Sequence, residues 1–108
     1  MNIVVAPTFE RDLKRLVKKY PSLRSEFPDL VESLMEDPLQ GIPLGKDCFK
    51  IRLRIASKGR GKSGGGRVIT CVKILDDKVY LLTLYDKSEQ SSIDEQRLDA
   101  LLEIAGLF

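Results

Sequence analysis

The chain has 108 residues, 43% hydrophobic and 31% charged, and its 18 Lys and Arg against 16 Asp and Glu leave a net charge of only +2. These proportions predict one globular domain, residues 1–108, with a single core. The sequence excludes a membrane-spanning protein, because the longest apolar run, residues 79–84, is too short to cross a bilayer. No N-terminal segment reads as a signal peptide. We therefore expect a cytoplasmic protein with no membrane partner.

The first half of the chain predicts a strand and two helices. Residues 2–6 read as a short strand that ends at Pro7, and Thr8 is a suitable N-cap for a helix that runs to about Lys19. Pro21 ends that helix. A second helix, with Leu30, Val31 and Leu34 at helical spacing, is placed from about Pro28, where proline would occupy the first turn. The prolines and glycine of residues 38–43 mark the end of this helical half.

The second half predicts three strands and a helix. The strands cover residues 48–55, 67–75 and 79–85, with a glycine-rich loop over 57–66 and a tight turn at 76–77. The sequence Ser92-Ile93-Asp94-Glu95 reads as a capping box that opens a final helix. The order β-α-α-β-β-β-α indicates an α+β fold, in which a mainly antiparallel sheet of about four strands packs against helices.

The modest net charge conceals a strongly polarised chain. Residues 46–73 hold nine cations and a single anion, whereas the rest of the chain is acidic. Within residues 48–55, apolar side chains alternate with Lys50, Arg52 and Arg54, so a strand there would show a row of positive charge on one face. A solvated outer face is the plain alternative, but such faces usually mix signs, and a polyanionic partner would relieve the repulsion.

The glycine-rich loop resembles a phosphate-binding loop only superficially. Residues 56–63 end in Gly-Lys-Ser, yet a strand follows where the phosphate-binding mechanism needs a helix N-terminus, so nucleotide hydrolysis is not expected. A simple hairpin connection is one interpretation. The cations Lys58, Arg60 and Lys62 among glycines favour another, namely a basic loop that contacts a nucleic-acid backbone.

Histidine is absent from the chain. A Cys-His or Ser-His catalytic pair is therefore unavailable, and two cysteines far apart in sequence do not make a structural zinc site, so we expect no metal or other cofactor. Cys48 and Cys71 fall in predicted strands and could be neighbours in a sheet. We interpret both as small hydrophobic residues.

Three segments, residues 48–54, 56–69 and 80–89, together resemble the RelE/HigB-type toxins of bacterial type II toxin-antitoxin systems, within the RelE/ParE superfamily. The resemblance implies a single RelE-like domain that enters the ribosomal A site and cuts messenger RNA. It also implies the partners: a cognate antitoxin, the ribosome with its messenger RNA, and operator DNA for the antitoxin complex.

The resemblance also assigns residues. The family's cationic positions fall on Lys50 and Arg52 of the first core strand, on Arg67 of the next strand and on Lys87 after the last strand, and the nearest match to its functional aromatic residue is Tyr85. We take these five as catalytic. The remaining cations of the basic segment are taken as RNA-binding: Arg54, Lys58, Arg60 and Lys62.

Elementary chemistry agrees with these roles. RNA cleaves when its 2′-OH attacks the adjacent phosphate, so fixed cations that orient the nucleotides and neutralise the phosphorane supply most of the catalysis. Arg67 should leave the core and join Lys50 and Arg52 in this task, and Lys87 could protonate the leaving 5′-oxygen. A lysine, Tyr85 or Glu89 could each serve as the base.

Two other functions fit the same fold. A ParE-like toxin would bind a DNA gyrase subunit without nuclease activity, although such relatives usually lack the basic catalytic set that this chain retains. A simple RNA-binding module is the third reading.

Overall fold

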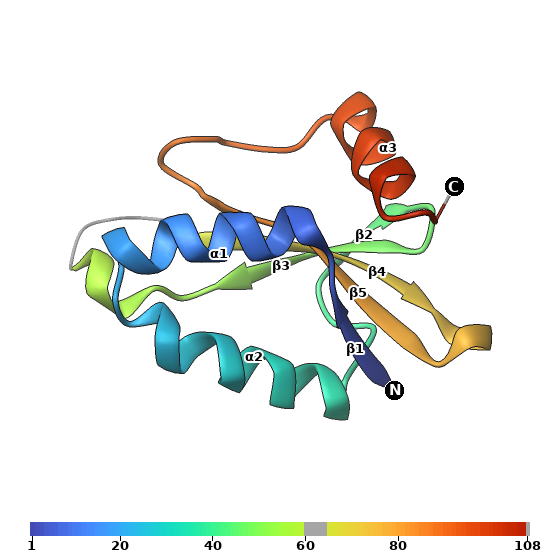
Figure 1. The fold of residues 1–108 in the computed structure, drawn as a ribbon, viewed down its shortest axis with the longest axis horizontal. Helices are drawn as coiled ribbons and strands as arrows, with labels where there is room; N and C mark the ends of the chain where they lie inside the picture. The colour runs from blue at the N-terminus through green and yellow to red at the C-terminus, as the bar shows by residue number, and fades with distance from the viewer. Residues whose placement is uncertain (60–64, 108) are drawn as a thin grey trace.

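The computed structural model describes residues 1–59 and 65–107. Helices and strands follow one another in the order shown in Figure 1. Their bounds are β1 (Asn2–Val5), α1 (Pro7–Lys19), α2 (Leu23–Glu36), β2 (Ile42–Gly45), β3 (Cys48–Leu53), β4 (Gly66–Lys73), β5 (Lys78–Asp86) and α3 (Glu95–Ile104), with short 3-10 turns η1 (Ala56–Lys58) and η2 (Ile74–Asp76).

The strands form a five-stranded sheet in the order β1-β5-β4-β3-β2. β1 pairs with β5 in parallel, and the other neighbouring pairs are antiparallel. The α+β class is confirmed, but the predicted count of four strands is wrong because β2 was interpreted as the irregular end of the helical half. Pro43 is tolerated in β2 since this is an edge strand, where a missing N–H costs no ladder hydrogen bond.

The turn between β2 and β3 explains why that hairpin was missed. Lys46 and Asp47 form its two-residue loop, and both have positive φ, 56° and 64°. This is the geometry of a type I′ hairpin turn, which normally carries Asn-Gly or Asp-Gly. Lys-Asp gives no such signal in the sequence.

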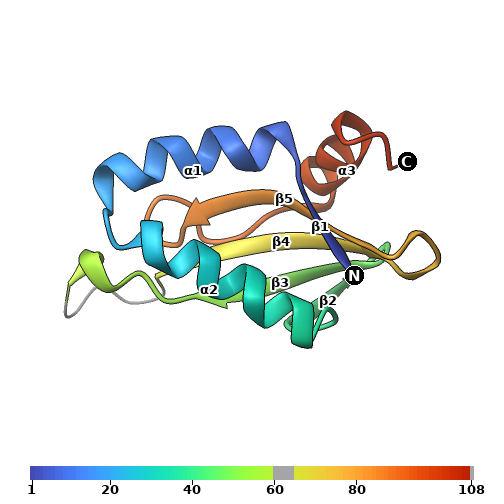
Figure 2. The same cartoon turned by 60° about the horizontal axis from the view of Figure 1, so that its bottom comes forward.

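The helices bury the two faces of the sheet unequally. Side chains of α1 and α2, among them Phe9, Leu16 and Leu34, share one core with Ile51 of β3, whereas Leu98 of α3 belongs to a second cluster on the other face. Figures 1 and 2 show α3 at the end of the sheet where β2 turns into β3, away from the C-terminal ends of β3 and β5. The second face is therefore covered at one end only.

Three helix boundaries differ from the prediction. α1 is capped by Ala6 with Pro7 in the first turn, and Thr8 lies inside the helix, where its buried hydroxyl donates to the Leu82 carbonyl at 2.5 Å. α2 begins at Leu23, so Pro28 lies within the helix and not at its start.

The start of α3 also differs. Asp94, not Ser92, is its N-cap, and its carboxylate accepts from the Arg97 amide at 2.7 Å. The predicted box was therefore displaced by two residues.

Candidate functional site

Three of the predicted catalytic residues lie in one row across the sheet. Arg52 of β3 is the cross-strand partner of Arg67 of β4, which is in turn the partner of Tyr85 of β5. Neighbouring strands are about 4.8 Å apart, so the backbones of these three residues span roughly 10 Å and their side chains leave the same side of the sheet. Like charges directly opposite each other are unfavourable unless an anion lies between or above them.

Lys50 lies on the same face, one row further along. Its partner on β4 is Ile69, which belongs to the cluster on the α3 side. Arg54 follows the end of β3 and is exposed, as is Arg52. The alternation predicted for residues 48–55 is thus found up to the end of the strand at Leu53, and the cations do share a face.

Arg67 differs from the expectation that it would leave the core. Only 8% of the residue is exposed, and its guanidinium donates to the Gly66 carbonyl at 2.9 Å. The central position of β4 explains this, because neighbours on both sides cover a residue that an edge strand would expose. A buried guanidinium is rigidly held, which suits the binding of a phosphate in a fixed geometry.

Tyr85 brings a buried phenol to this row. The residue is 4% exposed, and its hydroxyl has no hydrogen-bond partner among residues 1–59 and 65–107. Burial raises the pKa of Tyr85, and the nearby charge of Arg67 opposes that rise only in part. Tyr85 is therefore a neutral hydrogen-bond donor rather than a phenolate base.

Two predicted residues lie just beyond the strand ends. The Lys87 amide donates to the Gly65 carbonyl at 3.0 Å, which extends the β4–β5 ladder by one residue and keeps Lys87 on the side of Tyr85. Its ammonium donates to the Ser91 carbonyl at 2.6 Å. Glu89 instead turns toward α1, where its carboxylate lies 3.8 Å from both Arg15 and Lys19.

Lys58 does not suit the predicted RNA contact. Its side chain is only 2% exposed, and its ammonium lies 2.5 Å from the Asp86 carboxylate and 3.3 Å from the Gly65 carbonyl. Lys58 ends the turn η1, and its ammonium is buried because it pairs with a buried anion at the end of β5. Arg60 and Lys62, predicted to contact RNA with it, lie outside the described residues.

Asp86 is the residue that the sequence reasoning overlooked. It accepts hydrogen bonds from Lys58, from the Tyr20 hydroxyl at 2.5 Å, and from the amide and hydroxyl of Ser88 at 2.9 and 2.7 Å. Burial by itself raises the pKa of Asp86, but these hydrogen bonds outweigh it and hold the pKa well below the ordinary range. An acidic residue at the end of an almost wholly apolar strand was the available signal.

The Asp86 network has a positional consequence. Asp86 lies between Tyr85 and Lys87 in the chain, and Lys58 joins it to the start of the glycine-rich segment. The network thereby fixes the end of β5, where the predicted catalytic residues Tyr85 and Lys87 lie.

The described residues offer little for other kinds of site. No three His, Cys, Asp or Glu side chains gather as metal ligands within residues 1–59 and 65–107. In the same ranges, no helix combines the length and apolar character needed to cross a membrane.

Comparison with known proteins agrees with this fold. A family model described as the RelE toxin of the RelE / RelB toxin-antitoxin system matches residues 10–108. Among solved structures, a double mutant of Escherichia coli toxin RelE in the free state superposes with a TM-score of 0.60 at 16% identity, covering 83% of this chain and 86% of that one. The isolated E. coli RelE toxin gives 0.55 at 20% identity, with 95% and 97% covered. A conserved hypothetical protein of Helicobacter pylori gives 0.54 at 21% identity, with 82% and 97% covered.

Proposed function

The chain belongs to the RelE toxin family, and from that premise we propose that this toxin of a toxin-antitoxin system is an endoribonuclease that cuts messenger RNA in the ribosomal A site. The observation that carries the proposal is the row formed by Arg52, Arg67 and Tyr85 on a sheet face that α3 covers at one end only. It combines the exposed charge of Arg52 and the buried charge of Arg67 with a phenol that has no hydrogen-bond partner within residues 1–59 and 65–107, which is what a scissile phosphate requires.

In the proposed reaction, the ribose 2′-oxygen attacks the neighbouring phosphorus and the 5′-oxygen leaves. The products are a 2′,3′-cyclic phosphate and a 5′-hydroxyl, so no water is consumed. Arg52 and Arg67 neutralise the charge that develops on the phosphorane, and the neutral Tyr85 phenol donates to one of its oxygens. The chain's own cations supply the charge that a metal ion provides in other nucleases, so we propose a metal-independent enzyme.

The proton transfers complete the mechanism. Lys87 is the general acid for the leaving 5′-oxygen. Of the candidate bases, Tyr85 is disfavoured by its raised pKa and Glu89 by its contacts with α1. The remaining candidate is Lys50, which lies on the same face and accepts the 2′-proton in its neutral amine form. Arg54, which is exposed beyond β3, contacts the RNA backbone.

The partners follow from the same charges. Messenger RNA and ribosomal RNA are polyanions that match the cationic segment of residues 46–73, and ribosomes place the site of action in the cytoplasm. A cognate antitoxin with an acidic or amphipathic segment would cover this face, and the complex would bind operator DNA. Co-purification with the product of the adjacent gene tests the antitoxin. Good expression of the chain alone, without slowed growth, would contradict it.

Single-turnover cleavage of messenger RNA on programmed ribosomes tests the enzyme. Arg52→Ala should slow cleavage on the order of a hundredfold, the usual effect of removing a charge that stabilises the transition state. Because Arg52 is exposed, unfolding should hardly change. Arg24→Ala, which removes an exposed arginine from α2, is the matched control and should cleave at the wild-type rate.

The alternatives predict different results. Arg52→Ala that cleaves normally would remove this row from the active site. Intact messenger RNA together with inhibited supercoiling would favour the gyrase-binding toxin, and ribosome binding without either effect would favour a simple RNA-binding module. Arg67→Ala is less informative than its position suggests, because Arg67 is buried and its loss should also destabilise the fold.

A further inference from the structure

Cys48 and Cys71 face each other across β3 and β4, at the opposite end of the ladder from the arginine row. The Val72 amide donates to the Asp47 carbonyl at 2.8 Å, so 47–72 is a hydrogen-bonded pair and the adjacent Cys48–Cys71 pair is not. In such pairs, the Cα atoms are about 4.5 Å apart and the side chains are at their closest. A disulfide needs Cα atoms about 4.4 to 6.8 Å apart, so the backbone already meets its requirement.

The side chains agree with the backbone geometry. Both thiols donate to the same acceptor, the Lys46 carbonyl, at 3.4 and 3.9 Å. The interaction between the two thiols raises the pKa of Cys48, as burial also does, and lowers the pKa of Cys71, so Cys71 is the thiol that ionises first. Both sulfur atoms therefore lie on one side of the sheet, against one another.

We propose that Cys48 and Cys71 are a site of reversible covalent modification, at which a low-molecular-weight disulfide oxidises the pair to an intramolecular cross-strand disulfide. The Cys71 thiolate attacks the small disulfide and expels one small thiolate, which leaves a mixed disulfide. Cys48, once deprotonated, attacks the Cys71 sulfur and expels the second small thiolate. Two protein thiols and one small disulfide thus become one protein disulfide and two small thiols.

Access to the pair is controlled by α3. Cys48 and Cys71 are 1% and 0% exposed and cluster with Leu98, Leu101 and Leu102 of this helix. An oxidant therefore reaches them only when α3 moves away.

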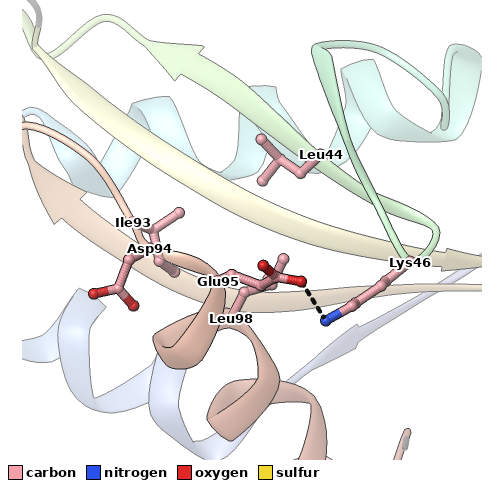
Figure 3. Close-up of a pocket in the computed structure, with 6 residues that line it drawn as sticks. All are labelled: Leu44, Lys46, Ile93, Asp94, Glu95 and Leu98. Atoms are coloured by element: carbon pink, nitrogen blue, oxygen red, sulfur yellow. Dashed lines mark hydrogen bonds and ion pairs between the residues drawn. The ribbon is translucent and has the colours of Figure 1, made fainter.

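Lys46 links α3 to the turn that carries the acceptor carbonyl. Its ammonium contacts Asp99 and lies 3.3 Å from Glu95, as Figure 3 shows for Glu95. A cavity of about 270 Å³ lies between this turn and the start of α3; it is lined by Leu44, Lys46, Ile93, Asp94, Glu95 and Leu98. α3 is thus held by its buried leucines and, at its first turn, by the ion pairs of Lys46, so removing these pairs should favour local opening of α3 without global unfolding.

The Cys48–Cys71 disulfide would enclose in one covalent loop the segment that carries most of the basic site. Lys50, Arg52 and Arg67 all lie between Cys48 and Cys71 in the chain. Oxidation therefore links β3 to β4 covalently and lowers the conformational entropy of residues 48–71 in the unfolded chain.

The test treats the full chain with oxidised glutathione and reads out the products by non-reducing peptide mass spectrometry. We expect one Cys48–Cys71 disulfide, reversed by dithiothreitol, and a Tm at least about 5 °C above that of the reduced protein. Lys46→Met should speed oxidation several-fold by loosening α3, whereas Lys14→Met, which breaks an exposed pair elsewhere, should leave the rate unchanged.

Several results would overturn the proposal. They are glutathione adducts without ring closure, disulfide-linked dimers, or thiols that react only in denaturant. Cys48→Ser must give no intramolecular bond. Because the readouts are the state of the two thiols and the Tm, the outcome does not depend on whether the protein cuts RNA.

Discussion

Lys58→Met should be among the most destabilising single substitutions in this chain. The change keeps the length of the side chain and removes its charge. Lys58 and Asp86 are paired inside the protein, with side chains 2% and 0% exposed. Without the ammonium, the Asp86 carboxylate stays buried, with Tyr20 and Ser88 as its remaining donors among residues 1–59 and 65–107.

The magnitude follows from desolvation. Leaving one member of a buried ion pair without its partner costs about 3 to 5 kcal/mol, and the remaining donors to Asp86 place this case near 3 kcal/mol. A domain of this size is stable by about 5 to 15 kcal/mol, so the variant should fold but lose much of its margin.

Urea unfolding at neutral pH, followed by circular dichroism, measures the loss. Lys14→Met is the matched control: the Lys14 side chain is 75% exposed and pairs with Glu10 at 3.2 Å, so the cost should stay under about 0.5 kcal/mol. A loss below about 1 kcal/mol for Lys58→Met would refute the buried-pair reasoning.

The same pair predicts a dependence on pH. The pKa of Asp86 is lower in the folded protein than in the unfolded chain, where it is about 3.9. Its contribution is therefore complete above about pH 5 and is lost as the pH falls through the folded value. The urea midpoint of the wild type should drop as the pH is lowered below about 4, and Asp86→Asn should show a weaker decline. Parallel curves for the two proteins would contradict this.

Three further predictions use the same urea titration. Tyr85→Phe should raise the free energy of unfolding by up to about 1 kcal/mol, because the buried hydroxyl has no partner within residues 1–59 and 65–107, while slowing RNA cleavage if the phenol serves the phosphate. Asp77→Gly should stabilise by about 0.5 to 1 kcal/mol, since Asp77 has a φ of 57°, whereas Asp76→Gly in the preceding turn should destabilise. Asp94→Ala should cost about 1 kcal/mol by removing the N-cap of α3, and Ser92→Ala should cost almost nothing.

The alternation of apolar and charged side chains along the strands accounts for most of what could be predicted from the sequence. Alternation in residues 48–53 correctly placed Lys50 and Arg52 on one face, because a side-chain period of two is a local property. The Arg52–Arg67–Tyr85 row followed once the strands paired in order.

The errors came from interactions that are distant in sequence and from local preferences that the fold overrides. Lys58 looked like a surface cation, and only the fold brings it to Asp86. The edge strand β2 depends on a Lys46–Asp47 turn whose backbone conformation its residues do not favour. Pro28 suggested the start of a helix that instead begins at Leu23, where packing outweighs the local preference of proline.

The parallel pairing of β1 with β5 bears on how the protein matures during synthesis. β1 is synthesised before the other four strands of the sheet, yet its partners are residues 78–81 of β5. Two hydrogen bonds have the same dependence: the Thr8 hydroxyl donates to the Leu82 carbonyl, and the Ala6 amide donates to the Leu81 carbonyl. Because such distant contacts must close a very long loop, the sheet cannot be completed until β5 has been translated. A nascent chain stays incomplete until then, so translation products that are truncated before β5 should be inert.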